Sequence, residues 1–133
     1  MRIVLDTNVF ISGVFFSGPP YDILKAWIDE RIQIVISSEI LQEYQRVGEE
    51  LSHQYPEIEI TPILKSFSKN AILISAPSLP HQVCVDPDDD KFFACAVAGN
   101  AELIISGDRH LLDINDFQGI KIVKPRRFVD EYL

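Results

Sequence analysis

The sequence has little cysteine, no long apolar run and no excess of basic residues, and each shortage excludes a class of protein. Its 133 residues include two cysteines, Cys84 and Cys95, and three scattered histidines. A structural zinc site needs four such ligands close together, so none is expected. The cysteines are expected to be free structural thiols in a reducing cytoplasm.

No apolar run reaches the roughly 18–20 residues that span a bilayer, and Asp6 interrupts the apolar centre that a signal peptide needs. We therefore expect a cytoplasmic protein without a membrane role.

The chain is acidic, with a formal net charge of −8. This charge argues against a general nucleic-acid binder, because such proteins are usually basic. It leaves room for an enzyme that acts on nucleic acid, since clustered active-site acids add negative charge that a bound divalent cation offsets locally. Hydrophobic residues make up 47% and charged residues 24%, as in ordinary globular proteins. The length suits one domain, which we assign to residues 1–133.

Strand-like and helix-like segments alternate along nearly the whole chain. Short β-branched runs predict strands, and apolar positions at helical spacing predict helices. The strands are expected near 2–6, 32–36, 71–75, 102–106 and 119–123, and the helices near 19–31, 38–53, 63–69, 88–98 and after 125, with a short turn or helix at 111–112. Residues 9–15 fit either a helix or an extended segment, and 76–87 form a loop. The alternation predicts an α/β fold with a mainly parallel sheet and helices on both faces.

Four acids stand at the ends of these elements. Asp6 closes the first strand, Asp108 follows the fourth, Asp90 opens a helix, and Glu43 lies on the shoulder of a helical apolar stripe. In parallel sheets, ligands collect at the carboxyl ends of strands where the strand order reverses. If the first and fourth strands are neighbours, their acids meet. Each acid also has a structural explanation alone, as a helix cap, a favourable charge at a helix start, a turn residue or a solvated side chain.

The acidic run 86–90 supports a cation more strongly than a single acid does. Asp88, Asp89 and Asp90 are consecutive, so they repel one another, and a bound cation would relieve that repulsion. We choose Asp90 as the ligand because the apolar segment 92–98 follows it, and Asp88 is the fallback. A helix that is apolar nearly all round is buried, which would fix its acidic end against the core.

If the four acids converge, Mg²⁺ or Mn²⁺ is the expected cofactor, because both ions prefer oxygen ligands. Such an ion positions a water molecule, lowers its pKa and neutralises charge on a phosphodiester. No serine–histidine pair or phosphate-cradling glycine loop offers a competing chemistry.

The chain resembles PIN-domain ribonucleases over essentially its whole length, and its ending resembles members that are toxins of toxin–antitoxin pairs. The matching pieces are Ile-Val-Leu-Asp-Thr-Asn at 3–8, Ser-Glu-Ile-Leu-Gln-Glu at 38–43, Asp-Lys-Phe-Phe-Ala-Cys-Ala at 90–96, Ile-Ser-Gly-Asp at 105–108 and Val-Lys-Pro-Arg-Arg-Phe at 123–128. The resemblance implies a three-layer α/β/α sandwich around about five strands. It also implies an endoribonuclease that depends on Mg²⁺ or Mn²⁺.

By position, the resemblance assigns Asp6, Glu43, Asp90 and Asp108 to one acidic pocket. Asp6, Asp90 and Asp108 would hold the metal, and Glu43 would complete the shell or orient the attacking water. The supporting polar residues would be Thr7, Asn8 and Ser106. The implied partners are an RNA substrate, an antitoxin protein and a second copy of the chain. Four basic side chains are either phosphate contacts or ordinary surface charges: Arg46, Lys91, Arg109 and Lys124.

Three other functions compete with the ribonuclease interpretation. A haloacid-dehalogenase-type phosphatase would want an acid two residues after Asp6, where Asn8 stands. A signalling receiver domain lacks its expected phosphoacceptor after a central strand. A catalytically inactive PIN-like module that binds RNA or protein remains open, although the four retained acids weigh against it.

Overall fold

The computed structural model describes residues 1–133 and has an α/β fold built on a six-stranded sheet. The strand order is β3-β2-β1-β4-β6-β5, and every pairing is parallel except that of β5 with β6. The strands are β1 (Arg2–Leu5), β2 (Gln33–Ile36), β3 (Ile72–Leu73), β4 (Leu103–Ile105), β5 (Asp116–Phe117) and β6 (Ile120–Val123). The predicted mainly parallel sheet is therefore confirmed.

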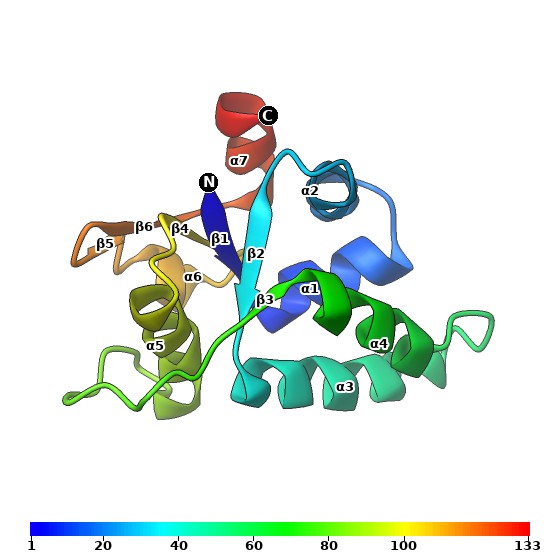
Figure 1. Ribbon diagram of the computed structural model, residues 1–133, viewed down its shortest axis with the longest axis horizontal. Helices are drawn as coiled ribbons and strands as arrows, with labels where there is room; N and C mark the ends of the chain where they lie inside the picture. Colours follow the sequence, from blue (N-terminus) through cyan, green and yellow to red (C-terminus); the bar gives the residue numbers. More distant parts are fainter.

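Seven helices and one 3₁₀ turn connect these strands. The helices are α1 (Thr7–Phe15), α2 (Pro19–Ile28), α3 (Ser38–Ser52), α4 (Ile60–Asn70), α5 (Asp90–Ala98), α6 (Arg109–Leu112) and α7 (Pro125–Tyr132), and the turn is η1 (Pro87–Asp89). In Figure 1, helices α1 to α4 lie on one side of β1 and β2, and α5 lies on the other. The sheet is thus enclosed between two helical layers, as the sequence predicts. No helix is both long enough and apolar enough to cross a membrane.

The central strands are buried because both of their faces meet helices. Every residue of the runs 3–5 and 34–36, and both Ile104 and Ile105, has no exposed surface. They belong to a single cluster of 33 buried apolar residues, which explains why these strands read as continuous apolar runs rather than alternating ones. Helix α5 is buried from Phe92 to Ala96, as its uniformly apolar sequence predicts. Cys84 and Cys95 are both buried and free.

Local signals mark where several helices begin and end. The side chain of Ser37 accepts a hydrogen bond from the backbone N–H of Ile40 and so caps α3, and Gly99 ends α5. The ambiguous segment 9–15 is helical, within α1, because Asp6 caps that helix through the N–H of Val9. The side chain of Asp6 therefore settles a choice that apolar spacing leaves open.

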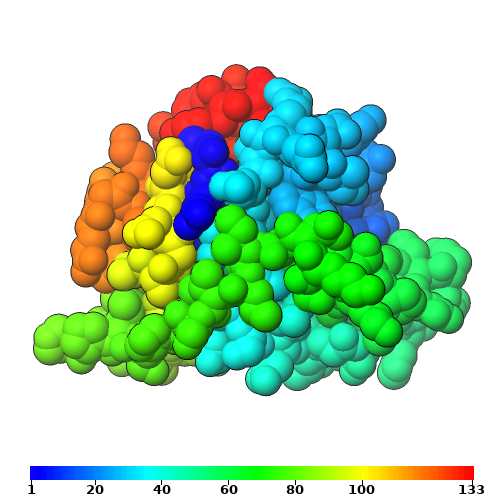
Figure 2. Space-filling model, in the orientation of Figure 1, coloured from blue at the N-terminus to red at the C-terminus, as the bar shows by residue number.

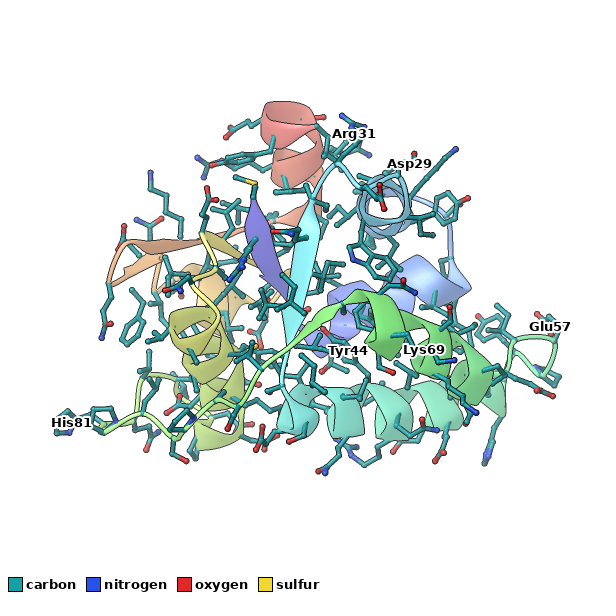
Figure 3. All side chains as sticks on the ribbon, in the orientation of Figure 1. Asp29, Arg31, Tyr44, Glu57, Lys69 and His81 are labelled. Atoms are coloured by element: carbon teal, nitrogen blue, oxygen red, sulfur yellow. The ribbon has the colours of Figure 1, made fainter.

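Two details of the sheet differ from expectation. It has six strands rather than about five, because the two residues of β5 pair with β6 in a short antiparallel ribbon. The third strand is limited to Ile72 and Leu73, after which residues 74–86 form a long connection to η1. In Figure 2, this green connection runs along the lower left of the molecule, and in Figure 3 His81 marks its outer end.

Candidate active site

The candidate site lies where the strand order reverses, at the carboxyl ends of β1 and β4. These strands are parallel neighbours with Leu5 opposite Ile105, and the backbone N–H of Asp6 donates to the carbonyl of Ile105 at 3.0 Å. The chain continues from β1 to β2 and β3 on one side and occupies β4 and β6 on the other. Such a switch point is the usual binding crevice of an open parallel sheet.

Ser106 joins the ends of the two strands. Its hydroxyl is fully buried and donates a hydrogen bond to Oδ2 of Asp6. The same hydroxyl oxygen accepts the backbone N–H of Asp108 at 2.9 Å. The other oxygen of Asp6 accepts the N–H of Val9 at 2.9 Å. Asp6 is therefore both the cap of α1 and a fixed carboxylate of the site, so its two readings from sequence are compatible.

Helix α3 is attached to the junction between β1 and α1 by two adjacent contacts. The hydroxyl of Thr7 donates to Oε2 of Glu43, and the hydroxyl of Tyr44 donates to the carbonyl of Leu5 at 2.6 Å. Tyr44 also stacks on Phe10 with ring centroids 4.2 Å apart, and Figure 3 shows it in the interior beside α1 and α3. These contacts turn Glu43 towards Asp6, although the apolar stripe alone puts it only on the shoulder of the helix.

A small open pocket of about 190 Å³ lies between these elements. Four acids line it, and each comes from a different segment: Asp6, Glu43, Asp89 and Asp108. The polar residues Thr7, Asn8 and Arg46 and three apolar residues complete the lining: Val47, Phe92 and Leu111. A larger pocket of about 780 Å³, bounded by α2 and α4, is mostly apolar and contains Glu30 as its one acid. With a single acid, this larger pocket lacks the set of carboxylate oxygens that binds a divalent cation.

The three consecutive aspartates at 88–90 have three different environments. Asp89 faces the pocket. The carboxylate of Asp90 accepts the backbone N–H groups of Val83 and Cys84 at 3.0 and 2.8 Å. Asp88 is exposed and forms an ion pair with Lys91 at 3.0 Å. The structure therefore brings Asp89 beside the other acids, while Asp90 is directed to the loop before η1.

Two acids of the pocket, Asp6 and Asp89, bind protons more tightly than free aspartates do. Burial raises the pKa of Asp6 from 3.8 to about 6, although hydrogen bonds from Ser106 and Val9 oppose the shift. Burial, with the nearby charges of Asp86 and Asp108, raises the pKa of Asp89 from 3.8 to about 6. Crowded carboxylates with raised pKa values are typical of a site where a cation or a proton offsets negative charge.

One lysine enters this acidic neighbourhood. The ammonium of Lys91 lies 2.7 Å from Oε1 of Glu43, with both side chains about 15% exposed or less. Burial lowers the pKa of Lys91, but its hydrogen bonds to Glu43 and Asp88 outweigh burial and raise it overall. Arg46 approaches the same oxygen of Glu43 at 3.7 Å and is largely exposed.

The donor set suits a hard divalent cation, because every candidate ligand is a carboxylate oxygen. No group of three acidic, histidine or cysteine side chains is already arranged to hold an ion together. Part of the reason is visible in the contacts: both oxygens of Asp6 and both of Glu43 accept hydrogen bonds within the protein. An ion would be held by a subset of these carboxylates completed by water, which is how Mg²⁺ is usually bound.

Sequence reasoning missed Asp89 because three adjacent acids at a helix start look alike. A 3₁₀ turn at Pro87–Asp89 precedes α5, and this turn decides which carboxylate faces the pocket. Pro87 gave a usable signal, since a proline at the first position of a turn starts the helical path early.

Comparisons with known proteins agree with this architecture. A family model described as a PIN domain matches residues 2–110. The uncharacterized protein MJ1680 of Methanocaldococcus jannaschii is 32% identical over 144 residues, which cover 99% of this chain and 92% of that protein.

Two solved structures are similar at 15% sequence identity. One is a chain of VapBC2 from Rickettsia felis bound to a DNA fragment from its promoter, with a TM-score of 0.55 over 93% of this chain and 98% of that chain. The other is PAE2754 from Pyrobaculum aerophilum, with a TM-score of 0.58 over 97% of this chain and 86% of that chain. Both likenesses concern the fold.

Proposed function

The chain belongs to the PIN-domain family, and from this membership we propose that it is a metal-dependent endoribonuclease that hydrolyses RNA phosphodiester bonds at the acidic pocket. One observation carries the proposal: four carboxylates from four separate chain segments surround one open pocket at the switch point of the sheet. A stable fold has no need to gather four acids around a pocket, because their mutual repulsion costs free energy.

We assign the ligand role to Asp6, Asp89 and Asp108, with Mg²⁺ or Mn²⁺ as the ion. Asp89 takes the role that the sequence assigned to Asp90, since the carboxylate of Asp90 is already occupied by two backbone N–H groups. When bound, the ion would lower the pKa of a water molecule and offset charge on the phosphodiester. Ser106 would keep Asp6 and the backbone at Asp108 at a fixed separation.

The other polar residues of the pocket would act on the substrate and the water. Glu43 is oriented by Thr7 and would accept a hydrogen bond from the attacking water. Arg46 lines the pocket with a side chain that is 62% exposed, so its guanidinium can turn towards an RNA phosphate. Arginine suits this contact because its planar group pairs with two phosphate oxygens at once.

We also propose that the nuclease is the toxin of a toxin–antitoxin pair. The fold likeness to VapBC2 favours this role, and the partner would be an antitoxin protein that blocks the pocket. Expression of the chain alone should then arrest cell growth, and co-expression of the product of a neighbouring small gene should restore it. If a variant with an inactive pocket arrests growth as strongly as the parent, the arrest does not come from RNA cleavage. That result would argue against the toxin role and would leave the nuclease proposal standing.

The nuclease is tested with purified protein, labelled single-stranded RNA and Mn²⁺. Asp6→Asn and Asp89→Asn should each reduce cleavage on the order of 100-fold or more, the usual scale when a group acting directly at a reacting centre is lost. Asp29→Asn is the matched control, because Asp29 is exposed and Figure 3 shows it far from α5.

Two outcomes would contradict the proposal. Metal-dependent cutting by Asp89→Asn at the parent rate would show that the pocket acids are wrongly assigned. RNA that is bound but never cut, with any divalent ion, would favour the alternative of a catalytically inactive PIN-like binding module.

A further inference from the structure

Lys91 is in an unusual position for a lysine. It is the second residue of α5, where the positive end of the helix dipole disfavours a cation. Its side chain is only 14% exposed, although lysine normally keeps its ammonium in water. Both costs need compensation, and two carboxylates provide it: Glu43 at 2.7 Å and Asp88 at 3.0 Å. The ammonium of Lys91 is therefore a fixed part of the acidic neighbourhood rather than a mobile surface charge.

Glu43 is fully engaged by this arrangement. Its Oε1 accepts from Lys91 and its Oε2 accepts from Thr7. Hydrogen bonds between charged partners are shorter and stronger than neutral ones. Glu43 already has a cation, and another ion would have to displace Lys91 to bind it directly.

The remaining pocket acids are in the opposite situation. None of the six ion pairs in the protein includes Asp6, Asp89 or Asp108. These three carboxylates face the pocket without a basic partner. The pocket thus has two parts. On one side Glu43 is paired with the ammonium of Lys91, and on the other Asp6, Asp89 and Asp108 have no basic side chain as a partner.

The charge balance agrees with this division. Asp6, Glu43, Asp88, Asp89 and Asp108 are five negative groups in and around the pocket, and Arg46 and Lys91 are two positive groups beside them. With every group ionised, these residues carry three net negative charges, and one divalent cation leaves a single negative charge. A second divalent ion would leave an excess of positive charge.

We propose that the ammonium of Lys91 is a built-in cation, filling the position between Glu43 and Asp88 where a second metal ion would bind, so that the pocket takes up one divalent ion per chain. This inference rests on the proposed function for the first ion. It gives Lys91 a positioning role, because Lys91 acts through Glu43 rather than on the RNA.

The experiment counts Mn²⁺ ions bound per chain in the absence of RNA. Free Mn²⁺ is followed by electron paramagnetic resonance while the metal is titrated into the full-length protein. The parent protein should bind one ion. Lys91→Met removes the built-in cation, leaves Glu43 and Asp88 facing the same space, and should raise the count to two.

Two control variants separate the effect of the charge from other effects. Lys91→Arg keeps a cation between the two carboxylates and should bind one ion. Lys69→Met makes the same change as Lys91→Met on an exposed lysine of α4, labelled in Figure 3, and should also bind one ion. If Lys91→Met fails to fold, as judged by circular dichroism, Lys91→Gln takes its place, because it keeps a hydrogen-bond donor towards Glu43 without the charge.

The outcomes distinguish this inference from the proposed function. Two ions bound to the parent protein, or one ion bound to folded Lys91→Met and Lys91→Gln, would overturn the role of Lys91 and leave the nuclease proposal standing. If the parent protein binds no Mn²⁺ at all, the metal dependence in the proposed function fails, and the built-in cation fails with it.

Discussion

Asp89 and Asp90 are adjacent in the sequence, yet their carboxylates serve different parts of the molecule. Asp89 faces the pocket, whereas Asp90 holds the backbone of residues 83 and 84. One of these amides belongs to Cys84, which is buried. A buried N–H without an acceptor costs free energy, so Asp90 fixes the loop that leads into η1.

We predict that Asp90→Ala lowers the stability of the protein through this loop. Two backbone N–H groups lose their acceptor, so the free energy of unfolding should fall by about 1–3 kcal/mol. Asp90→Asn keeps one carbonyl oxygen and should lose less. Urea unfolding followed by circular dichroism measures both values. An Asp90→Ala variant as stable as Asp130→Ala, which alters an exposed acid of α7, would contradict this structural role.

The sequence could not assign these residues because their difference is one of orientation. Asp6 and Asp108 are identifiable as strand-end acids, and both line the pocket. Glu43 has an ambiguous helical phase, and two hydroxyl contacts from distant residues settle it. The assignment of metal ligands among these acids stays a prediction.

At the scale of elements, the connection between α1 and α2 depends on close backbone approach. A Cβ at Gly13 would lie 2.8 Å from the carbonyl oxygen of Pro20 and 2.7 Å from Cδ1 of Leu24. The backbone atom at Pro20 cannot swing aside as a side chain can. Gly13 therefore permits α2 to pack against α1, the helix that Asp6 caps.

We predict that Gly13→Ala destabilises the fold. The overlap should cost about 1–3 kcal/mol, although alanine by itself would favour a helix by roughly 0.5–1 kcal/mol. Gly107→Ala is the control, because a Cβ there meets nothing within 4 Å. Thermal unfolding of the two variants provides the test. Equal melting temperatures for Gly13→Ala and the parent would show that the two helices separate without cost.

Helices and strands with a strong apolar pattern were predictable from the sequence. Short strands that are defined only by their hydrogen bonds to a neighbouring strand were not. Apolar runs predicted the four strands that contribute most to the sheet, helical spacing predicted α2 and α3, and a nearly uniform apolar segment between an acidic run and Gly99 predicted α5. The short strand β5 has two residues, Asp116 and Phe117, and no pattern of that length separates a strand from a turn. Strand order also could not be read, because it depends on contacts between residues about a hundred positions apart, such as Leu5 and Ile105.

For the whole molecule, the negative charge has a structural cost. The formal net charge is −8, and part of it is concentrated in the pocket, where burial raises the pKa of Asp6 to about 6. A group with a raised pKa binds its proton more tightly in the folded state than in the unfolded state. Protonation of Asp6 therefore stabilises the folded protein.

We predict that the metal-free protein becomes more stable as the pH falls from 7.5 to 5. The contribution of Asp6 is fully present below its unfolded pKa and is lost as the pH rises through its folded value of about 6. Between pH 5 and pH 7.5 it should amount to about 1–2 kcal/mol. Urea unfolding in EDTA measures the dependence.

Asp6→Asn provides the comparison for this pH effect. The variant lacks the titrating carboxylate, so its stability should change less between pH 5 and pH 7.5 than that of the parent. Parallel curves for the two proteins would mean that Asp6 does not carry the effect. Asp89, with its pKa of about 6, is present in both proteins, so its contribution to the pH dependence is common to the two curves.

The double attachment of α3 to the junction between β1 and α1 limits where the chain can change length during evolution. Thr7 reaches Glu43 and Tyr44 reaches the carbonyl of Leu5, so two consecutive residues of α3 are matched to the three residues that join β1 to α1. One residue inserted between Ser37 and Glu43 would rotate both contacts by about 100° around the helix axis. We expect insertions to be far better tolerated beyond the other end of α3, in the turn around Glu57, which Figure 3 shows at the outer edge of the molecule. We expect related chains to vary in length there and to keep the spacing from Ser37 to Tyr44 unchanged.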